Sequence, residues 1–284
     1  DPRPGGSGRR LTAPAVRPLA ASLADMSDSA ALRVGVIGAG GRMGRTACAA
    51  VASADDLDLT VAVDPAAAGS RISGVTVVGA MADLLDAGVD VAVDFSVADA
   101  SRANLPVLAA AGVHAVVGTT GLDADDLSAL RQAFTSSNCL LVPNFAIGAV
   151  LMQRFAEMAA PWFDTAEIIE FHHDGKVDAP SGTALATAER MAAASADWAE
   201  DPTEREVLPG ARGGAGPADI RIHAVRMRGM VAHQEVVLGT TGQTLVIRHD
   251  TIDRASFMPG LLLAVRNVAE LSGLTVGLDG LLGL

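Results

Sequence analysis

Residues 34–44 read Val-Gly-Val-Ile-Gly-Ala-Gly-Gly-Arg-Met-Gly and connect a short β-branched run to a segment of helix-forming residues. The run at 34–37 predicts a buried strand, and the segment at 42–53 predicts a helix. Glycines at such a turn allow a phosphate group to approach the backbone N–H groups at the start of the helix. The stretch therefore predicts a turn that binds the pyrophosphate of a dinucleotide. A tight turn that needs glycine only for its positive φ is the alternative interpretation.

The glycine spacing departs from the common dinucleotide-binding pattern G-x-G-x-x-G. Counted from Gly38, the third glycine of that pattern falls on Met43, and the chain has Gly44 one position later. Asp64 supports the dinucleotide interpretation, because it ends the next predicted strand, where a carboxylate can accept hydrogen bonds from ribose hydroxyls. A 2′-phosphate would face that negative charge, which favours NADH. Arg42 could still reach a 2′-phosphate, so the use of NADPH stays open.

The sequence after this turn alternates between short apolar runs and longer segments rich in Ala and Leu. Nearly continuous apolar strands separated by helices are typical of a parallel sheet that is covered on both faces. We therefore expect an α/β fold whose first domain is a Rossmann-like, doubly wound parallel sheet. Its predicted strands are 34–37, 57–63, 89–95, 113–117 and 140–142, and its predicted helices are 42–53, 81–87, 99–111 and 124–136.

The pattern changes after residue 144. Three apolar runs at 220–228, 233–239 and 244–248 lie too close together for helical crossovers, so these strands should pair mostly antiparallel. We therefore expect a second α+β domain with a mixed, largely antiparallel sheet. The other predicted elements of this region are a helix at 147–160, a strand at 166–171, a helix at 182–194, a polar loop at 201–219 and a final helix at 257–271.

These elements define the expected domain organisation. Residues 1–31 are rich in Pro, Gly, Ala, Ser and Arg and are expected to form a flexible extension. Met26 in this extension reads like a native start, and an Arg-rich transit peptide is the alternative. Residues 32–144 should bind a dinucleotide, and residues 145–250 should bind the substrate and form the oligomer. Residues 251–284 should form a C-terminal helix and tail that return to the first domain.

Composition narrows the class of protein. The chain has 21 basic and 33 acidic residues, a net charge of -12, 3% aromatic residues and no Tyr, which disfavours a nucleic-acid partner. No apolar run reaches the ~20 residues of a membrane-spanning helix, so we expect no membrane partner. Cys48 and Cys139 form neither a metal-binding spacing nor a disulfide framework, which fits a reducing cytoplasm.

Two further segments follow predicted strands. They are Gly-Thr-Thr-Gly at 118–121 and Pro-Asn-Phe at 143–145. The carboxyl ends of parallel strands lie at one edge of the sheet, where ligands of such folds bind. We therefore expect both segments to face the nicotinamide half of a cofactor. An ordinary turn is the alternative for each of them.

A second informative stretch lies at 170–183 and reads Glu-Phe-His-His-Asp-Gly-Lys-Val-Asp-Ala-Pro-Ser-Gly-Thr. It places two of the six His and the only Lys, Lys176, within five positions. His and Lys side chains can exchange protons, and residues 181–183, at the start of the next predicted helix, can present hydroxyls and N–H groups to a carboxylate. The stretch therefore predicts the reduction of an acidic substrate, in which the arrival of a hydride is matched by a proton.

Other interpretations of this stretch stay open. Its histidines could be ordinary surface or core residues, and Asp-Ala-Pro-Ser-Gly is also a common turn that leads into a helix cap. A zinc site fits poorly, because adjacent histidines with no third His or Cys nearby do not have the spacing of zinc ligands. We therefore expect no metal.

At these residues the sequence closely resembles the dihydrodipicolinate reductases, now called 4-hydroxy-tetrahydrodipicolinate reductases, of bacterial lysine and diaminopimelate biosynthesis. The actinobacterial members are particularly similar. The matching segments are 38–44, 117–121, 144–148 and 170–184, and the resemblance extends from about residue 32 to the end. The string His-His-x-x-Lys-x-Asp-Ala-Pro-Ser-Gly-Thr is highly specific to the family. Pro65 departs from the family's sequence pattern, because NADPH-preferring members can carry Arg at this position.

The resemblance implies a cytoplasmic homotetramer that reduces an α,β-unsaturated cyclic imine dicarboxylate, after loss of water from 4-hydroxy-tetrahydrodipicolinate, to give tetrahydrodipicolinate. It implies NADH or NADPH as cofactor, and the charge of Asp64 favours NADH or the use of both. It also implies His172 as general acid or base and Lys176 as proton donor. The substrate would be held by His173, Ser181, Gly182 and Thr183, and the cofactor by Gly38, Ala39, Gly40, Gly41, Arg42, Met43, Asp64, Gly118, Thr119, Thr120, Val142, Pro143, Asn144 and Phe145.

Two rival functions are compatible with parts of the sequence. Another two-domain dehydrogenase, acting for example on an amino-acid semialdehyde or homoserine, would leave the His-His-x-x-Lys segment without a role. A regulator that senses NADH without turnover would need the glycine turn but not the proton-transfer residues. Single-turnover oxidation of NADH by the dicarboxylate substrate separates an enzyme from such a regulator.

Overall fold

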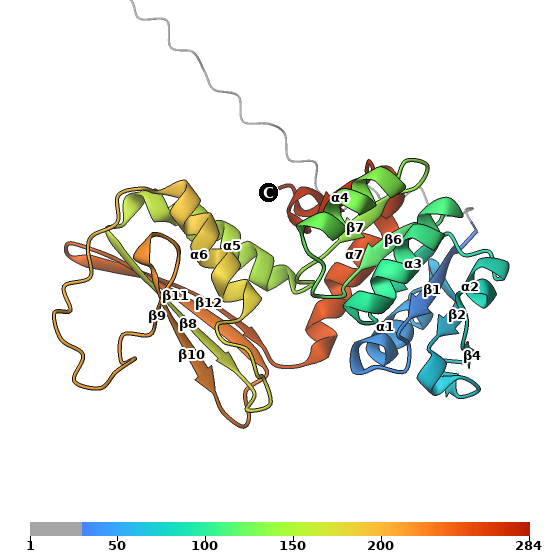
Figure 1. The fold of residues 1–284 in the computed structure, drawn as a ribbon, viewed down its shortest axis with the longest axis horizontal. Coiled ribbons are helices and arrows are strands. Elements are labelled where there is room, and N and C mark those ends of the chain that lie inside the picture. Colours follow the sequence, from blue (N-terminus) through green and yellow to red (C-terminus); the bar gives the residue numbers. More distant parts are fainter. Residues whose placement is uncertain (1–29) are drawn as a thin grey trace, which may run out of the picture.

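The structure is a computed structural model that describes residues 30–284. Figure 1 shows two lobes, each built around one sheet. The prediction of a flexible extension at residues 1–31 lies outside the described residues, apart from its last two positions. Across residues 30–284, no helix is both long enough and apolar enough to span a membrane.

The first sheet contains β1 (Leu32–Ile37), β2 (Leu57–Val63), β3 (Arg71–Ile72), β4 (Val75–Val78), β5 (Val91–Asp94), β6 (His114–Val117), β7 (Cys139–Leu141) and β13 (Leu274–Val276). Its helices are α1 (Arg42–Ala52), α2 (Met81–Asp86), α3 (Ala98–Ala110), α4 (Ala124–Ala133) and α7 (Met258–Asn267).

The strands of the first sheet lie in the order β13-β7-β6-β5-β1-β2-β4-β3, and all neighbours are parallel except β3 and β4. Helices α1 and α7 pack on one face, and α2, α3 and α4 pack on the other. Because both faces are covered, strands such as β5 are buried along their whole length. The predicted Rossmann-like α/β class is therefore confirmed.

The second sheet contains β8 (Thr165–His172), β9 (Gly214–Ala215), β10 (Arg221–Arg226), β11 (Ala232–Thr240) and β12 (Gln243–Thr251), in the order β12-β11-β8-β10-β9. Strands β8 and β10 are parallel and the other neighbours are antiparallel, so the predicted mixed, largely antiparallel sheet is confirmed. Helices α5 (Ile147–Ala159) and α6 (Gly182–Ala194) cover one face (Figure 1). Beneath them pack Ile168, Val236 and Leu238.

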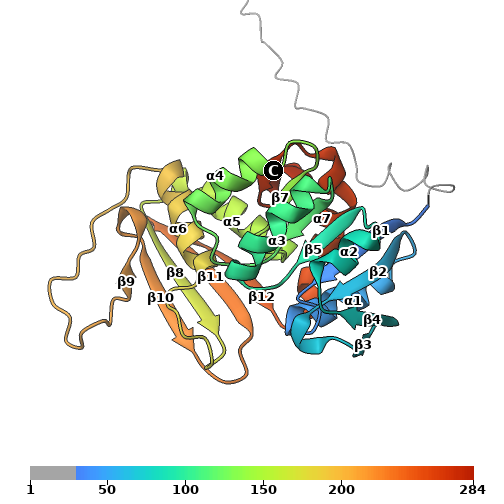
Figure 2. The same ribbon diagram turned by 45° about the vertical axis from the view of Figure 1, so that its right-hand side comes forward.

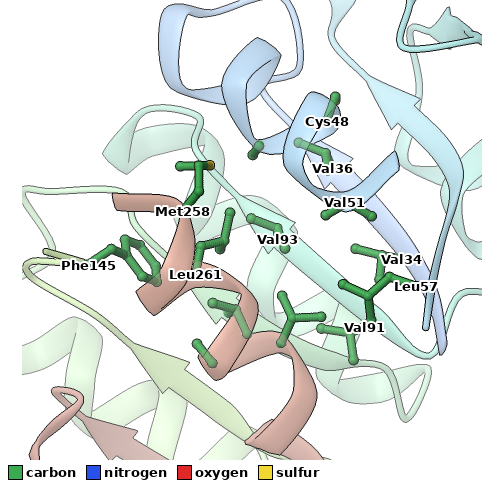
Figure 3. Packing of buried hydrophobic residues seen from close by; sticks show 14 of the residues in the cluster. Val34, Val36, Cys48, Val51, Leu57, Val91, Val93, Phe145, Met258 and Leu261 are labelled. Carbon is green, nitrogen blue, oxygen red and sulfur yellow. The ribbon is translucent and has the colours of Figure 1, made fainter. Parts of the chain in front are cut away.

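The chain returns to the first sheet after β12. Among the elements of the chain, only the 3-10 turn Arg254–Phe257 separates β12 of the second lobe from α7 of the first lobe, so Figure 2 draws both in similar colours. Met258 and Leu261 of α7 pack in one core with Val93 of β5 and with Phe145 (Figure 3). Gly260 permits this contact, since a Cβ atom there would overlap the carbonyl oxygen of Phe145. The C-terminal helix thus anchors the segment that leads from β7 into α5.

Four short strands differ from the sequence prediction. Strands β3 and β4 form a hairpin because Ser73 and Gly74 both adopt a positive φ, 47° and 92°, as the two-residue turn requires. Strand β9 lies inside the predicted loop at 201–219, and β13 follows the last helix; with two and three residues, they carry almost no periodicity. The predicted helix at 257–271 is also shorter, because it ends in a 3-10 turn after Asn267.

Candidate active site

The glycine turn between β1 and α1 is closely packed. Gly38 has a φ of 74°, and a Cβ atom there would lie 2.6 Å from the carbonyl oxygen of Phe95. A Cβ atom at Gly44 would overlap the carbonyl oxygen of Gly38. Gly44 therefore permits the same close approach of helix and turn as the third glycine of the common pattern, although it lies one position later in the chain. The N-cap of α1, Gly41, has no side-chain hydrogen bond, so the first N–H groups of the helix can bind an anion.

Asp64 lies beside this turn, directly after β2. Its Oδ2 accepts a hydrogen bond from the N–H of Gly40 at 2.9 Å, and its Oδ1 accepts one from the N–H of Ala66 at 2.9 Å. Each carboxylate oxygen keeps a lone pair for a further donor. With Gly38 and Gly41, Asp64 lines a pocket of the first lobe whose other walls include apolar side chains. This pocket has the chemistry to hold a ribose and an apolar ring face.

A second pocket, which we call the interlobe cleft, lies between the two lobes and has a volume of about 280 Å³. Phe95 lines both pockets, so the two adjoin. The first lobe contributes residues at strand ends, as the parallel sheet predicts. The cleft is lined by Met43, Phe95, Gly118, Val142, Pro143, Asn144 and Phe145 on that side, and by His172, Ser181, Thr183, His233, Gln234 and His249 on the other.

An aromatic pair shapes the first-lobe wall of the cleft. The rings of Phe95 and Phe145 pack edge to face with their centroids 5.6 Å apart. A Cβ atom at Gly118 would overlap the ring of Phe95 and lie 2.8 Å from the ring of Phe145. Gly118 is therefore glycine because the two rings occupy the space of a side chain.

A buried carboxylate holds the ends of β5 and β6 together behind this wall. Asp94 is fully buried and accepts hydrogen bonds from the hydroxyls of Ser96 and Ser101 at 2.6 and 3.0 Å. The hydroxyl of Thr119 donates to the same carboxylate at 3.2 Å. Thr119 thus points into the protein, whereas Thr120 is exposed.

His172 enters the cleft at the end of β8. Its Nδ1 lies 2.6 Å from Oε2 of Glu170, which is fully buried. Burial lowers the pKa of His172, Glu170 opposes this effect, and the nearby Lys176 and Arg226 add to the lowering. Because the pKa lies below its usual value, the ring loses its proton readily, and it can both donate and accept a proton in the cleft.

Lys176 and His173 lie on the loop that follows β8 and do not line the interlobe cleft. The Nζ of Lys176 lies 2.7 Å from each carboxylate oxygen of Asp178. This contact holds the pKa of Asp178 below its usual value. The N–H of Lys176 donates to the carbonyl of His173 at 3.1 Å and closes a tight turn. Of the predicted His-His-Lys cluster, the structure therefore places only His172 in the cleft itself.

Helix α6 begins at the cleft. Its N-cap is Ser181, whose Oγ accepts a hydrogen bond from the N–H of Ala184 at 3.2 Å. Thr183 also lines the cleft, whereas Gly182 is exposed. The amide of Asn144 donates to the hydroxyl of Thr183 at 3.3 Å and so links the two lobes. The free N–H groups in the first turn of α6 face a cavity where a carboxylate can bind.

Of the other predicted contacts, Ala39 is buried beneath the turn and Arg42 is exposed at the start of α1.

The sequence analysis missed several groups of the site, above all Glu170, Arg226, Asp94, His233 and His249. Glu170 lies two positions before His172, so both side chains fall on one face of a strand, and this spacing could have revealed it. Arg226 meets them only because β10 pairs with β8. Across the described residues 30–284, no group of three or more His, Cys, Asp or Glu side chains is arranged to hold a metal ion.

The fold and the site together define a class of protein. A Rossmann-like lobe with a glycine turn and a carboxylate after its second strand faces a lobe that places His172, His233 and His249 in the shared cleft. This is the arrangement of a two-domain oxidoreductase that uses a pyridine nucleotide. Two family descriptions, "Dihydrodipicolinate reductase, N-terminus" and "Dihydrodipicolinate reductase, C-terminus", match residues 32–145 and 148–282. The chain belongs to the dihydrodipicolinate reductase family.

Individual relatives agree with this assignment. The chain is 48% identical over 260 residues to 4-hydroxy-tetrahydrodipicolinate reductase of Nocardia farcinica, a match that covers 89% of this chain and 99% of the relative. It is 49% identical over 257 residues to the enzyme of the same name from Mycobacterium ulcerans, covering 89% and 100%. A dipicolinate-bound dihydrodipicolinate reductase from Paenisporosarcina has a similar structure, with a TM-score of 0.79, 34% identity and coverage of 88% and 99%.

Proposed function

We propose that the interlobe cleft is the active site of this reductase. The reaction is the reduction of 4-hydroxy-tetrahydrodipicolinate to tetrahydrodipicolinate by a reduced pyridine nucleotide, in the biosynthesis of lysine and diaminopimelate. The observation that carries the proposal is the lining of the cleft, where Gly118 and residues 142–145 face His172, Ser181 and Thr183. Consumption of the reduced cofactor that depends on freshly prepared substrate tests it.

The first lobe offers a continuous site for the cofactor. The crowded glycine turn leaves the N-terminus of α1 free for the pyrophosphate, and Asp64 would accept the ribose hydroxyls. Met43, Gly118 and residues 142–145 would lie beside the nicotinamide, with Thr119 and Thr120 at the end of β6 completing this edge. When bound there, the reduced nicotinamide supplies a hydride to the substrate ring.

The second lobe would bind the substrate, a small cyclic dicarboxylate. Ser181 and Thr183, with Gly182 between them, would present their N–H and hydroxyl groups to one carboxylate. His173 and Lys176 would reach the substrate from the adjoining loop. For Lys176 this requires a partner exchange, in which a substrate carboxylate replaces Asp178 at Nζ.

The protons of the reaction come from the same lobe. The substrate loses a hydroxyl and a hydrogen as water, and the unsaturated ring then takes up one hydride and one proton. We assign proton transfer as general acid or base to His172, whose ring lines the cleft, and proton donation to Lys176. Burial lowers the pKa of His172, so its protonated ring releases a proton readily, as a general acid must.

We propose that Asp64 makes NADH at least as good a cofactor as NADPH, because its carboxylate repels a 2′-phosphate. Asp64→Ala should lower the ratio of kcat/KM for NADH to kcat/KM for NADPH by about tenfold, which corresponds to ~1.4 kcal/mol. Since Asp64 also holds Gly40 and Ala66, the matched variant is Asp64→Asn, which keeps the size and one acceptor but loses the charge. Steady-state kinetics with both cofactors measure the ratio. A strong preference of the wild type for NADPH would contradict this role.

We propose that the second sheet forms a homotetramer through the face that α5 and α6 leave open. Ile169 and Val237 alternate with residues buried under these helices, so they point the other way, and Val246 pairs with Val237. Val246 is 51% exposed. Sedimentation equilibrium should give a mass of four chains, and Val246→Asp, which puts a charge on this face, should lower the mass. A wild-type monomer would overturn this proposal.

We also propose a cytoplasmic location. Cys48 and Cys139 are both free thiols buried in the first lobe, which agrees with a reducing compartment.

A further inference from the structure

A buried ion pair lies directly behind His172 and Ser181, on the second-lobe side of the cleft. Both carboxylate oxygens of Glu170 accept hydrogen bonds from the guanidinium of Arg226, at 2.7 Å each. Each oxygen accepts a second bond, Oε2 from Nδ1 of His172 at 2.6 Å and Oε1 from the N–H of Ser181 at 3.0 Å. With no exposed surface, Glu170 reaches the cleft only through these partners.

The contacts of Glu170 determine which nitrogen of His172 carries the fixed proton. Burial alone would raise the pKa of Glu170, but the bonds from Arg226 and His172 hold it below its usual value, so the group is an anion. An ionised carboxylate only accepts hydrogen bonds. At 2.6 Å, Nδ1 of His172 must therefore donate, which leaves Nε2 as the nitrogen that exchanges a proton.

The same ion pair also holds the two other parts of the site. The guanidinium of Arg226 donates to the carbonyl oxygen of Asp178 at 2.8 Å, and the Asp178 side chain binds Nζ of Lys176. On the other side, Ser181 donates its N–H to Glu170 and caps α6. The ring of His172, the Lys176 loop and the start of α6 therefore share one anchor.

We propose that Glu170 is the positioning residue of this active site. It orients His172 so that Nε2 faces the cleft, it holds the start of α6 through the N–H of Ser181, and through Arg226 it holds the Lys176 loop. This role rests on the proposed function of His172 in proton transfer. It resembles the way a buried carboxylate holds a catalytic imidazole in one tautomer in hydrolases of other folds.

The proposal predicts a change in pH dependence as well as in rate. Glu170 stabilises the protonated ring, so its loss lowers the pKa of His172 further. A general acid works in its protonated form, so activity is lost as the pH rises through that pKa. The basic limb of the kcat profile should therefore move to lower pH in Glu170→Gln. The other titratable or charged groups near the ring include Lys176, Arg226, His233 and His249, and this substitution changes the chemistry of none of them.

The test compares three variants of the full-length enzyme. Glu170→Gln should lower kcat by about 10²- to 10⁴-fold, with the KM for the cofactor nearly unchanged. Glu170→Asp keeps the charge and should retain the wild-type position of the basic limb even where kcat falls. The matched control is Glu167→Gln, because Glu167 lies on the same strand and also binds an Arg and a His, but points away from the cleft.

A readout without substrate separates this proposal from the role of His172. The ¹⁵N spectrum of the ring should show the Nδ1–H tautomer in the wild type and a shift toward Nε2–H in Glu170→Gln. If the tautomer changes while His172→Ala keeps full activity, the proposed function of His172 fails, and Glu170 still fixes the tautomer of the ring. If the basic limb of Glu170→Gln stays in place, or its tautomer matches the wild type, Glu170 is a structural residue only.

Discussion

Lys176→Ala is expected to lower kcat by about 10²- to 10⁴-fold, the usual contribution of one acid or base group, and to leave the affinity for NADH nearly unchanged. Donation of a proton is an interaction of the transition state, so its loss appears in kcat, whereas the loss of uniform binding appears in KM. Lys176 also lies on the second lobe, away from the glycine turn, so cofactor binding should not sense the change. Steady-state kinetics and NADH titration measure the two quantities.

Lys176→Arg distinguishes proton donation from electrostatic binding. Arg keeps the charge and can pair with Asp178 as Lys176 does, but it does not release a proton near neutral pH. Its kcat should therefore stay low even if its KM for the substrate recovers. An active Lys176→Arg enzyme would assign the residue to carboxylate binding and leave His172 as the sole candidate acid.

His172→Ala is expected to lower kcat by about 10²- to 10⁴-fold as well, because it removes the only proton-transferring group of the His-His-Lys segment that lines the cleft. If His172 and Lys176 serve one proton-transfer step, the double variant should be less impaired than the product of the two single effects. Strictly multiplicative losses would mean that the residues act in separate steps. Wild-type kcat in His172→Ala would remove this residue from the mechanism.

Most of the fold could be predicted because its determinants are local. The strands around the glycine turn are continuous apolar runs, and the helices that follow them are recognised from residue type and periodicity. Gly44 lies one position later than the common pattern requires. It still agrees with the pattern, because it leaves the space beside Gly38 that the packing of helix against turn needs. The strands that the prediction missed, β3, β4, β9 and β13, have only two to four residues each.

The candidate site was only partly predictable for the same reason. His172, Lys176 and Ser181 lie in one continuous stretch whose residue types indicate proton transfer and anion binding. Arg226 lies in a strand whose own sequence shows no partner, and it reaches Glu170 only through the parallel pairing of β8 with β10. The position of Lys176 on Asp178, outside the cleft lining, likewise depends on how the loop folds.

The most direct test of this account is single-turnover oxidation of enzyme-bound NADH after mixing with freshly generated 4-hydroxy-tetrahydrodipicolinate, followed by the absorbance of the reduced nicotinamide. The account predicts that the wild type oxidises one NADH per bound substrate, rapidly, and that His172→Ala binds NADH normally but oxidises it about 10²-fold or more slowly. NADH that binds to the wild type but is not oxidised when substrate arrives would contradict the account, because the chain would then sense the cofactor without catalysing a reaction.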